Sequence, residues 1–154
     1  MFLLAGFFSI LFLQSCFDEN PKEKEKVQKE CDSMKSLDGL SFFLRGFNLS
    51  EVDTILVKEI SSGSRSDTLT YVVRPEIVNK KRSMTYLNAT LEKEVLIADK
   101  YLIIIRGVSP HVLKNLKIGT MAQSDMFTAH YRCGLVGYEL DGQVFNDGGI
   151  TIEK

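Results

Sequence analysis

The chain has 154 residues, which is enough for one domain with a single hydrophobic core. Its 19 basic and 20 acidic side chains nearly cancel, so no strong net charge would attract nucleic acid or an anionic substrate to its surface. Ten Phe, five Tyr and no Trp accompany many Val, Ile and Thr residues, and this composition favours strands over helices.

The first segment with a distinct pattern is the apolar run over residues 2–13, "FLLAGFFSILFL". This run is too short to cross a bilayer, which takes about 20 apolar residues. Its length matches the apolar core of a secretory signal, which is about 7–15 residues long. The alternative interpretation is a buried strand or helix of a cytoplasmic protein.

The residues that follow, "LQSC" at positions 13–16, resemble a bacterial lipobox, in which a small residue precedes an obligatory cysteine. The resemblance implies that residues 1–15 are a signal peptide that is removed just before Cys16. It also implies that the Cys16 thiol carries a diacylglyceryl group and that the new amino terminus is acylated. Two or more acyl chains make membrane attachment durable, whereas one chain holds a protein only marginally.

The segment over residues 16–36 is polar and charged, with few apolar side chains. Such a segment buries too little surface to offset its ordering entropy, so we expect a lipidated, disordered tether, with a short helix over residues 24–30 as the alternative. Its start, "FDE" at residues 17–19, resembles the surface-export signal of Bacteroidota lipoproteins. An ordinary acidic linker explains these residues equally well, which leaves the outer surface and the periplasm both open.

The folded domain is predicted over residues 37–154 and consists of short strands. A Ser- and Gly-rich loop over residues 61–66 predicts a hairpin between the strands on either side of it, and Pro75 ends the second of these. Residues 100–107 are apolar without alternation, as in a strand that is buried on both faces. The predicted strands of this part cover residues 40–47, 51–60, 67–74, 83–90, 92–98 and 100–107.

The C-terminal part is predicted to end in hairpins. Residues 109–116 fit a short helix, with a strand over residues 113–118 as the alternative, and residues 120–128 fit a loop. Asp141-Gly142 between β-rich runs predicts a hairpin turn, and a second turn follows at residues 146–149. The whole pattern predicts an all-β fold, a single antiparallel β-sandwich of the immunoglobulin-like or the transthyretin-like type.

The cysteines at positions 31 and 133 are the two that remain once Cys16 is used for lipidation. Outside the cytoplasm disulfides persist, so a bridge between Cys31 and Cys133 is expected, with two free thiols as the alternative. The order of lipobox, tether, cysteine before the first strand and cysteine in a late strand resembles small Bacteroidota outer-membrane lipoproteins that carry an immunoglobulin-like domain. This resemblance covers the layout of the chain and brings no catalytic motif.

Histidines occur only at positions 111 and 130. Cys133 follows His130 by three residues, and on a strand that spacing places two side chains on opposite faces, which is wrong for one metal ion. CxxC, HExxH, GxSxG and SxxK motifs are absent from the sequence. We therefore predict no metal, no cofactor and no catalytic residue.

Oxygen ligands for calcium are offered by Asp141, Asn146 and Asp147, which surround the two C-terminal turns. The alternating acidic positions of a calcium loop are taken by Gln143 and Phe145. Since Asp, Asn and Gly are favoured in turns for their backbone conformation alone, we interpret these residues as turn residues.

Three motifs combine Asp, a hydroxyl residue and an aliphatic residue, and they centre on Ser33, Thr54 and Thr68. They resemble the O-glycosylation acceptors of exported Bacteroidota proteins, in which the hydroxyl residue carries the sugar. The alternative is that turn and strand preferences alone placed these residues.

Together these patterns predict a non-enzymatic lipoprotein of the cell envelope, anchored in a membrane, with the outer membrane as the expected site. The sandwich would bind a protein or a glycan, or serve as a subunit of an envelope assembly, through strand edges and loops. Residues 150–152 are one candidate edge, unless they are paired inside a sheet. The alternative function is an envelope enzyme, or its accessory domain, whose site is built from residues scattered along the sequence.

Overall fold

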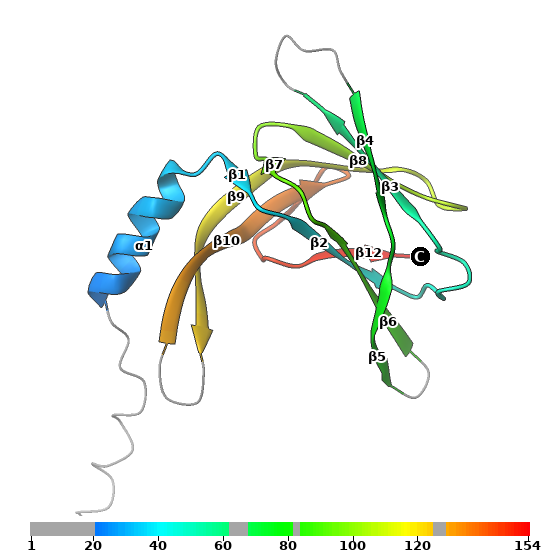
Figure 1. Ribbon diagram of the computed structural model, residues 1–154, viewed down its shortest axis with the longest axis horizontal. Coiled ribbons are helices and arrows are strands. Elements are labelled where there is room, and N and C mark those ends of the chain that lie inside the picture. The colour runs from blue at the N-terminus through cyan, green and yellow to red at the C-terminus, as the bar shows by residue number, and fades with distance from the viewer. Residues whose placement is uncertain (1–20, 62–67, 82–83, 125–128) are drawn as a thin grey trace, which may run out of the picture.

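The computed structural model describes residues 21–61, 68–81, 84–124 and 129–154. It confirms the all-β prediction, because two main sheets pack in a sandwich-like arrangement and one short helix lies beside them (Figure 1). The elements are α1 (Pro21–Ser33), β1 (Ser36–Leu37), β2 (Leu40–Arg45), β3 (Ile55–Ile60), β4 (Thr68–Val73), β5 (Glu76–Lys81), β6 (Met84–Leu91), β7 (Val95–Leu96), β8 (Lys100–Ile105), β9 (His111–Ser124), β10 (Ala129–Leu140), β11 (Gln143–Phe145) and β12 (Ile150–Glu153).

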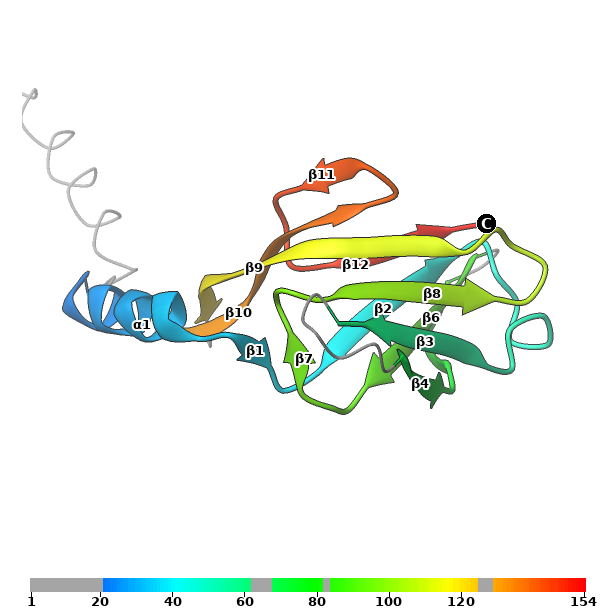
Figure 2. The same ribbon diagram turned by 90° about the horizontal axis from the view of Figure 1, so that it is seen from above.

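The larger sheet has six strands in the order β11-β10-β9-β8-β3-β4, and all of its neighbours are antiparallel. The predicted hairpin around the Ser- and Gly-rich loop is confirmed as β3–β4, whose register runs from Ile55 opposite Val73 to Ile60 opposite Thr68. Strand β4 ends before Pro75, as predicted. Figure 2 shows β9, β8, β3 and β4 following one another across this sheet.

The smaller sheet has four strands in the order β12-β2-β6-β5. Its edge strand β12 pairs parallel with β2, so the sandwich is not antiparallel throughout. A parallel pair needs a connection longer than a hairpin turn, and here almost the whole domain separates β2 from β12. Ile150 and Ile152 of β12 are fully buried and complete the core from this side.

Two predicted strands, over residues 51–60 and 92–98, are shorter in the structure by four residues or more. Strand β3 begins at Ile55 because residues 48–52 form a turn, in which the N–H groups of Glu51 and Val52 donate to the Asn48 carbonyl at 2.9 and 3.2 Å. Of the strand predicted over residues 92–98, only the two residues of β7 are paired, and they pair with β1. Local hydrogen bonds in the turn compete there with strand pairing.

The expectation that β8 is buried on both faces is wrong. Tyr101, Ile103 and Ile105 are buried, whereas Leu102 and Ile104 are half-buried on the opposite face. The inner residues join a core of aliphatic and aromatic side chains from both sheets. Its most deeply buried large members include Phe42, Leu44, Ile55, Leu87, Leu113 and Ile150.

Strand β9 is the longest of the described elements. It corrects two predictions, because residues 111–116 form a strand instead of a helix, and residues 120–124, the described part of the predicted loop over residues 120–128, form a strand as well. The alternative strand over residues 113–118 is confirmed as part of it. Strand β9 pairs with β8 only over His111–Leu113 and continues with β10 to Ser124, so these two strands extend beyond the sandwich (Figure 2). Residues 120–124 resemble a loop in sequence because that part of the hairpin lies away from the core.

Helix α1 corrects the prediction of a disordered tether for residues 21–33, and it is longer than the alternative helix predicted over residues 24–30. It lies against β9 and β10 (Figure 1). The alternating signs of its sequence also place opposite charges four residues apart, and such pairs stabilise a helix. Two such pairs are Glu25–Lys29 at 2.8 Å and Lys26–Glu30 at 4.0 Å.

Among the residues that the structure describes, no helix has the length and apolar character needed to cross a bilayer. The predicted signal peptide and the lipidation residue Cys16 lie outside those residues, so the membrane anchor stays a prediction.

Candidate functional site

The outer faces of the two sheets differ in character. On the four-stranded sheet the outward side chains are mainly polar, and several pair with one another. The Ser41 and Thr90 hydroxyls lie 3.2 Å apart, and the Arg45 guanidinium lies 3.0 Å from the Glu153 carboxylate. Phe43, 43% exposed, is the large apolar residue on this face. A polar outer face is expected of a sheet that has one side in contact with solvent.

The outer face of the six-stranded sheet instead carries aliphatic side chains from four adjacent strands. In one row Leu56 of β3 lies between Val72 of β4 and Ile104 of β8, and in the next row Leu102 of β8 lies opposite Val112 of β9. These five residues form the aliphatic stripe. Val72 is 63% exposed and Val112 is 39% exposed, while the other three are half-buried. Lys58 of β3 lies on the same face beside Leu102, so a charge borders the stripe at that point. Aliphatic side chains gathered on the outer face of a sheet are a candidate interaction surface.

The stripe reaches β4, which is the edge strand of this sheet. The other edge strands of the two main sheets are short or irregular: β11 has three residues, β12 has four, and the pairing of β5 shifts register between Ile77 and Asn79. Strand β4 has six residues in unbroken register and no charged residue, and its Leu69 is 52% exposed. Strand β4 therefore has no charge, register break or shortness of its own to protect it as an edge strand, while residues 90–93 at the end of β6 lie beside it.

A groove of about 400 Å³ runs beside β4, between Thr70–Val73 and the residues 90–93 at the end of β6. Within it Tyr71 is held from two sides. Its hydroxyl donates to Oε2 of Glu59 at 2.8 Å, and the Lys93 ammonium lies 5.6 Å from the centre of its ring. These contacts hold the middle of β4 to the sandwich, and residues 90–93 form the opposite wall of the groove.

Two buried carboxyl groups lie beneath this end of the sheet. Glu59 is 8% exposed and Asp99 is 3% exposed. Burial raises the pKa of Glu59, and the neighbouring Asp99 raises it further, while the hydrogen bond from Tyr71 acts in the opposite direction. Burial also raises the pKa of Tyr101, whose hydroxyl donates to the Leu96 carbonyl at 3.0 Å. Hydrogen bonds thus pair Glu59 with Tyr71, and Tyr101 with the Leu96 carbonyl, inside the sandwich.

A second groove, of about 500 Å³, lies where β9 leaves β8. The backbone turns there at Asn115, whose φ of 53° is in the left-handed region. The polar groups at its rim pair with each other: Glu139 accepts from the Asn115 amide at 2.7 Å and from the Lys114 ammonium at 2.9 Å, and these bonds lower its pKa. Its apolar wall includes Ile97, Leu116, Tyr138 and Val144.

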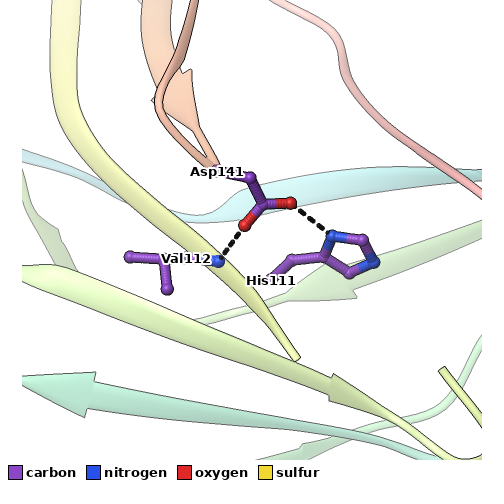
Figure 3. A network of polar contacts seen from close by, with 3 residues as sticks. All are labelled: His111, Val112 and Asp141. Atoms are coloured by element: carbon purple, nitrogen blue, oxygen red, sulfur yellow. Dashed lines mark hydrogen bonds and ion pairs between the residues drawn. The ribbon is translucent and has the colours of Figure 1, made fainter. Parts of the chain in front are cut away.

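Asp141 ties the hairpin turn to the start of β9 (Figure 3). Its Oδ2 lies 2.7 Å from Nδ1 of His111, and its Oδ1 accepts from the Val112 N–H at 2.7 Å. Burial raises the pKa of Asp141, but these hydrogen bonds outweigh burial and hold it below its ordinary value. The turn prediction is confirmed, since Asp141 and Gly142 have φ of 51° and 87°.

The structure does not bring the two histidines together. His111 lies opposite Ile103 at the start of β9, whereas His130 lies opposite Gln123 near the far end of the β9–β10 hairpin. Asp147 accepts the N–H of Gly149 at 3.2 Å, as a turn residue does. Within the described part of the chain, no three His, Cys, Asp or Glu side chains gather as metal ligands.

The predicted bridge joins Cys31 of α1 to Cys133 of β10, with the sulfur atoms 2.08 Å apart and the Cα atoms 5.3 Å apart. Cys31 is the one buried residue of α1. Beside the bridge the Thr120 hydroxyl donates to Oε1 of Gln28 at 2.7 Å. The cross-link therefore connects the segment that follows the proposed anchor to the long hairpin of the larger sheet.

The three predicted glycosylation residues lie in different places. Ser33 is exposed at the end of α1 and donates to the Glu30 carbonyl at 2.7 Å. Thr54 is half-buried and donates to its neighbour Asp53 at 3.1 Å. Thr68 is exposed at the start of β4, while the acid before it lies outside the described residues. Their modification stays a prediction.

Sequence reasoning missed the aliphatic stripe, although its signal is visible in "ILV" at residues 55–57 and "YLIII" at residues 101–105. Apolar residues at successive strand positions point to both faces of a sheet. The structure also shows that residues 150–152 form an edge strand rather than an inner one. No family model, no curated protein and no solved structure matches this chain.

Proposed function

We propose that this protein is a membrane-anchored lipoprotein of the cell envelope that binds another envelope protein through the outer face of its six-stranded sheet. The observation that carries the proposal is the aliphatic stripe, which crosses four strands while the other sheet presents polar side chains. An aliphatic surface supports a protein partner over a glycan, because a sugar needs polar groups that match its hydroxyls.

The anchor is supported by the apolar run over residues 2–13 and the lipobox-like "LQSC" that follows it. Helix α1 begins at Pro21, and the chain from Cys16 to Pro21 spans at most about 18 Å when fully extended. A lipid on Cys16 would therefore keep the sandwich close to the membrane, where its partner would also lie. The disulfide supports the same location, because such bridges persist outside the cytoplasm.

The binding face is tested by crosslinking the full chain in its native envelope and recovering the complex. Val72→Lys and Leu102→Lys place a charge on the stripe, and Thr151→Lys places the same charge on an exposed residue of the smaller sheet. We expect one partner to be recovered with the wild type and with Thr151→Lys, and to be lost with both stripe variants. Thermal melts establish that all three variants are folded. Equal recovery with every variant would refute binding through this face.

The anchor is tested separately by fractionating cells that express Cys16→Ala. Wild type is expected in the membrane fraction, with residues 1–15 removed and acyl groups on Cys16, whereas the variant is expected in the soluble fraction. Unchanged membrane retention of Cys16→Ala would exclude lipid anchoring at this residue. Protease accessibility on intact cells then distinguishes the outer surface from the periplasm.

A further inference from the structure

We infer that the protein bound at the aliphatic stripe carries a carboxylate that pairs with Lys58. This inference rests on the binding proposed above and adds the chemistry of the partner. Lys58 of β3 lies on the same face as the stripe, because it alternates with the buried residues Val57 and Glu59. Across the sheet it lies between Thr70 of β4 and Leu102 of β8.

The positions around Lys58 are mostly apolar. Its neighbours on this face along β3 are Leu56 and Ile60, and Ile60 is 43% exposed. Lys58 itself is half-buried. Within the described parts of the chain, no carboxylate lies at ion-pair distance from its ammonium group. The charge therefore depends on water for its stabilisation, and an apolar surface placed over it would remove that water.

The chain leaves the positive charge of this face without an acidic neighbour. Strands β4, β8 and β9 contain no acidic residue, and the one acid of β3, Glu59, is buried on the inner face. Lys100 of β8 lies opposite Ile60, which places it diagonally next to Lys58, with the Cβ atoms about 7 Å apart. Two like charges at this spacing repel each other, and a carboxylate close to both would relieve the repulsion.

A partner that covers the stripe would also cover Lys58, because Leu56 and Leu102 lie directly beside it. An ammonium group buried without a counter-charge is strongly unfavourable, so a purely aliphatic partner surface would bind poorly. A carboxylate opposite Lys58 offsets this cost and also fixes how the two surfaces align. The chemistry that fits this face is therefore a set of aliphatic side chains around one or two acidic residues.

An anionic membrane surface would also offer negative groups to Lys58. Apolar side chains that anchor a protein in a membrane enter it by about 5–10 Å, which requires that they project from the surface. Of the stripe residues, Leu56, Leu102 and Ile104 are half-buried, and only Val72 at the edge strand is more than half exposed. Such a face suits close packing against another folded protein better than insertion into lipid.

Zero-length crosslinking with a carbodiimide tests the pairing, because this reagent joins an amine to a carboxylate that is in contact with it. The full chain is treated in its native envelope, and the joined peptides are identified by mass spectrometry. The Lys114–Glu139 ion pair, at 2.9 Å on the same sheet, is the internal control for reaction at this face. We expect an amide between Lys58 and an Asp or Glu of the partner.

Two results of this experiment would overturn the inference. The first is the absence of a product at Lys58 in a sample in which Lys114 and Glu139 are joined and the partner is recovered. The second is a phospholipid, instead of a protein carboxylate, joined to Lys58, which would assign the face to the membrane.

Substitutions at Lys58 separate binding from folding, with the partner recovered by co-purification without crosslinking. Lys58→Met removes the charge from an apolar face, so the isolated chain should melt at the same temperature or higher. Recovery should fall at least about tenfold with Lys58→Met and further with Lys58→Glu, while Lys58→Arg should retain it. Lys22→Glu makes the same charge change at an exposed residue of α1 and should leave recovery unchanged.

The inference and the proposed binding face fail in different ways. Loss of the partner with Val72→Lys but full recovery with Lys58→Met would leave the face standing and overturn its acidic partner, because Lys58 would then serve only to keep an apolar face soluble. Full recovery with both variants would remove the face and this inference together.

Discussion

Replacing both bridge cysteines, Cys31→Ser with Cys133→Ser, tests how α1 is held to the long hairpin. The bridge spans a sequence separation of 102 residues. In the chain-entropy model a cross-link that closes a loop of about 100 residues stabilises the folded state by about 4.7 kcal/mol. That value applies if α1 remains docked after the bridge is removed, because only the unfolded chain then gains freedom.

If α1 detaches when the bridge is removed, we expect a smaller loss in the free energy of unfolding. The folded variant then also gains freedom, and position 31 is separated from the folded domain only by the roughly 5 residues that lead from it to Ser36 at the start of β1. The difference between closing the long loop and the short one is 1.5RT times the logarithm of their ratio, which is about 3 kcal/mol. Since Cys31 is the one buried residue of α1, we expect this smaller value.

Guanidinium unfolding followed by far-UV circular dichroism measures the loss, and hydrogen exchange over residues 21–33 reports whether α1 is docked. We expect a loss of about 3 kcal/mol, because a free helix of this length is marginal in water, together with fast exchange throughout α1. A loss close to the larger value with α1 amides still protected would show that packing, not the bridge, holds the helix. No loss at all would refute the chain-entropy reasoning.

Three further predictions concern single groups. Because the pKa of Glu59 is raised above 4.5 in the folded chain, the folded state binds the extra proton and stability falls as pH rises through the folded pKa. In thermal melts between pH 4.5 and neutrality, Glu59→Gln should reduce the fall of melting temperature with rising pH. Parallel plots of melting temperature against pH for the wild type and the variant would contradict this prediction. Because the pKa of Asp141 is lowered below 3.8, its contribution is present at neutral pH and lost as pH falls through the folded pKa. Asp141→Asn keeps an acceptor for the Val112 N–H, and because the Asp141 side chain is 45% exposed, it should lower the free energy of unfolding by less than about 1 kcal/mol at pH 7. In acid the substitution should not lower stability. An equal loss of stability at both pH values would exclude the charge of Asp141 as the origin of the loss. Intact mass of the protein from its native host should exceed polypeptide plus lipid if the three Asp-hydroxyl motifs are glycosylated, and a mass equal to that sum excludes it.

Local rules were sufficient for the parts of this fold where neighbouring residues determine the structure. The β3–β4 hairpin follows from a loop between two β-rich runs, and the turn at Asp141-Gly142 follows from two residues that tolerate positive φ. The bridge between Cys31 and Cys133 follows from counting the cysteines that remain. In the two turns one short-range preference acts without a competitor, while the bridge, which joins residues 102 positions apart, could be predicted because two cysteines allow only one pairing.

The errors arose where distant segments decide the outcome. Helix α1 forms in a charged segment because opposite charges recur four residues apart and because Cys31 attaches it to β10. The polar residues 120–124 form a strand because β10 supplies their hydrogen bonds outside the core. Strand β12 joins β2 in parallel, a pairing between segments at opposite ends of the domain that no local pattern specifies.

The error on β8 and the proposed binding face have the same physical origin. A run such as "YLIII" indicates only that both faces of a strand are apolar, and it does not indicate which molecule covers each face. In this domain Tyr101, Ile103 and Ile105 are covered by the chain itself, while Leu102 and Ile104 face outward beside Leu56. If burial on both faces is what the sequence encodes, the second cover must come from another protein. A charge at position 102 should then affect recovery of the partner far more than it affects the stability of the isolated chain.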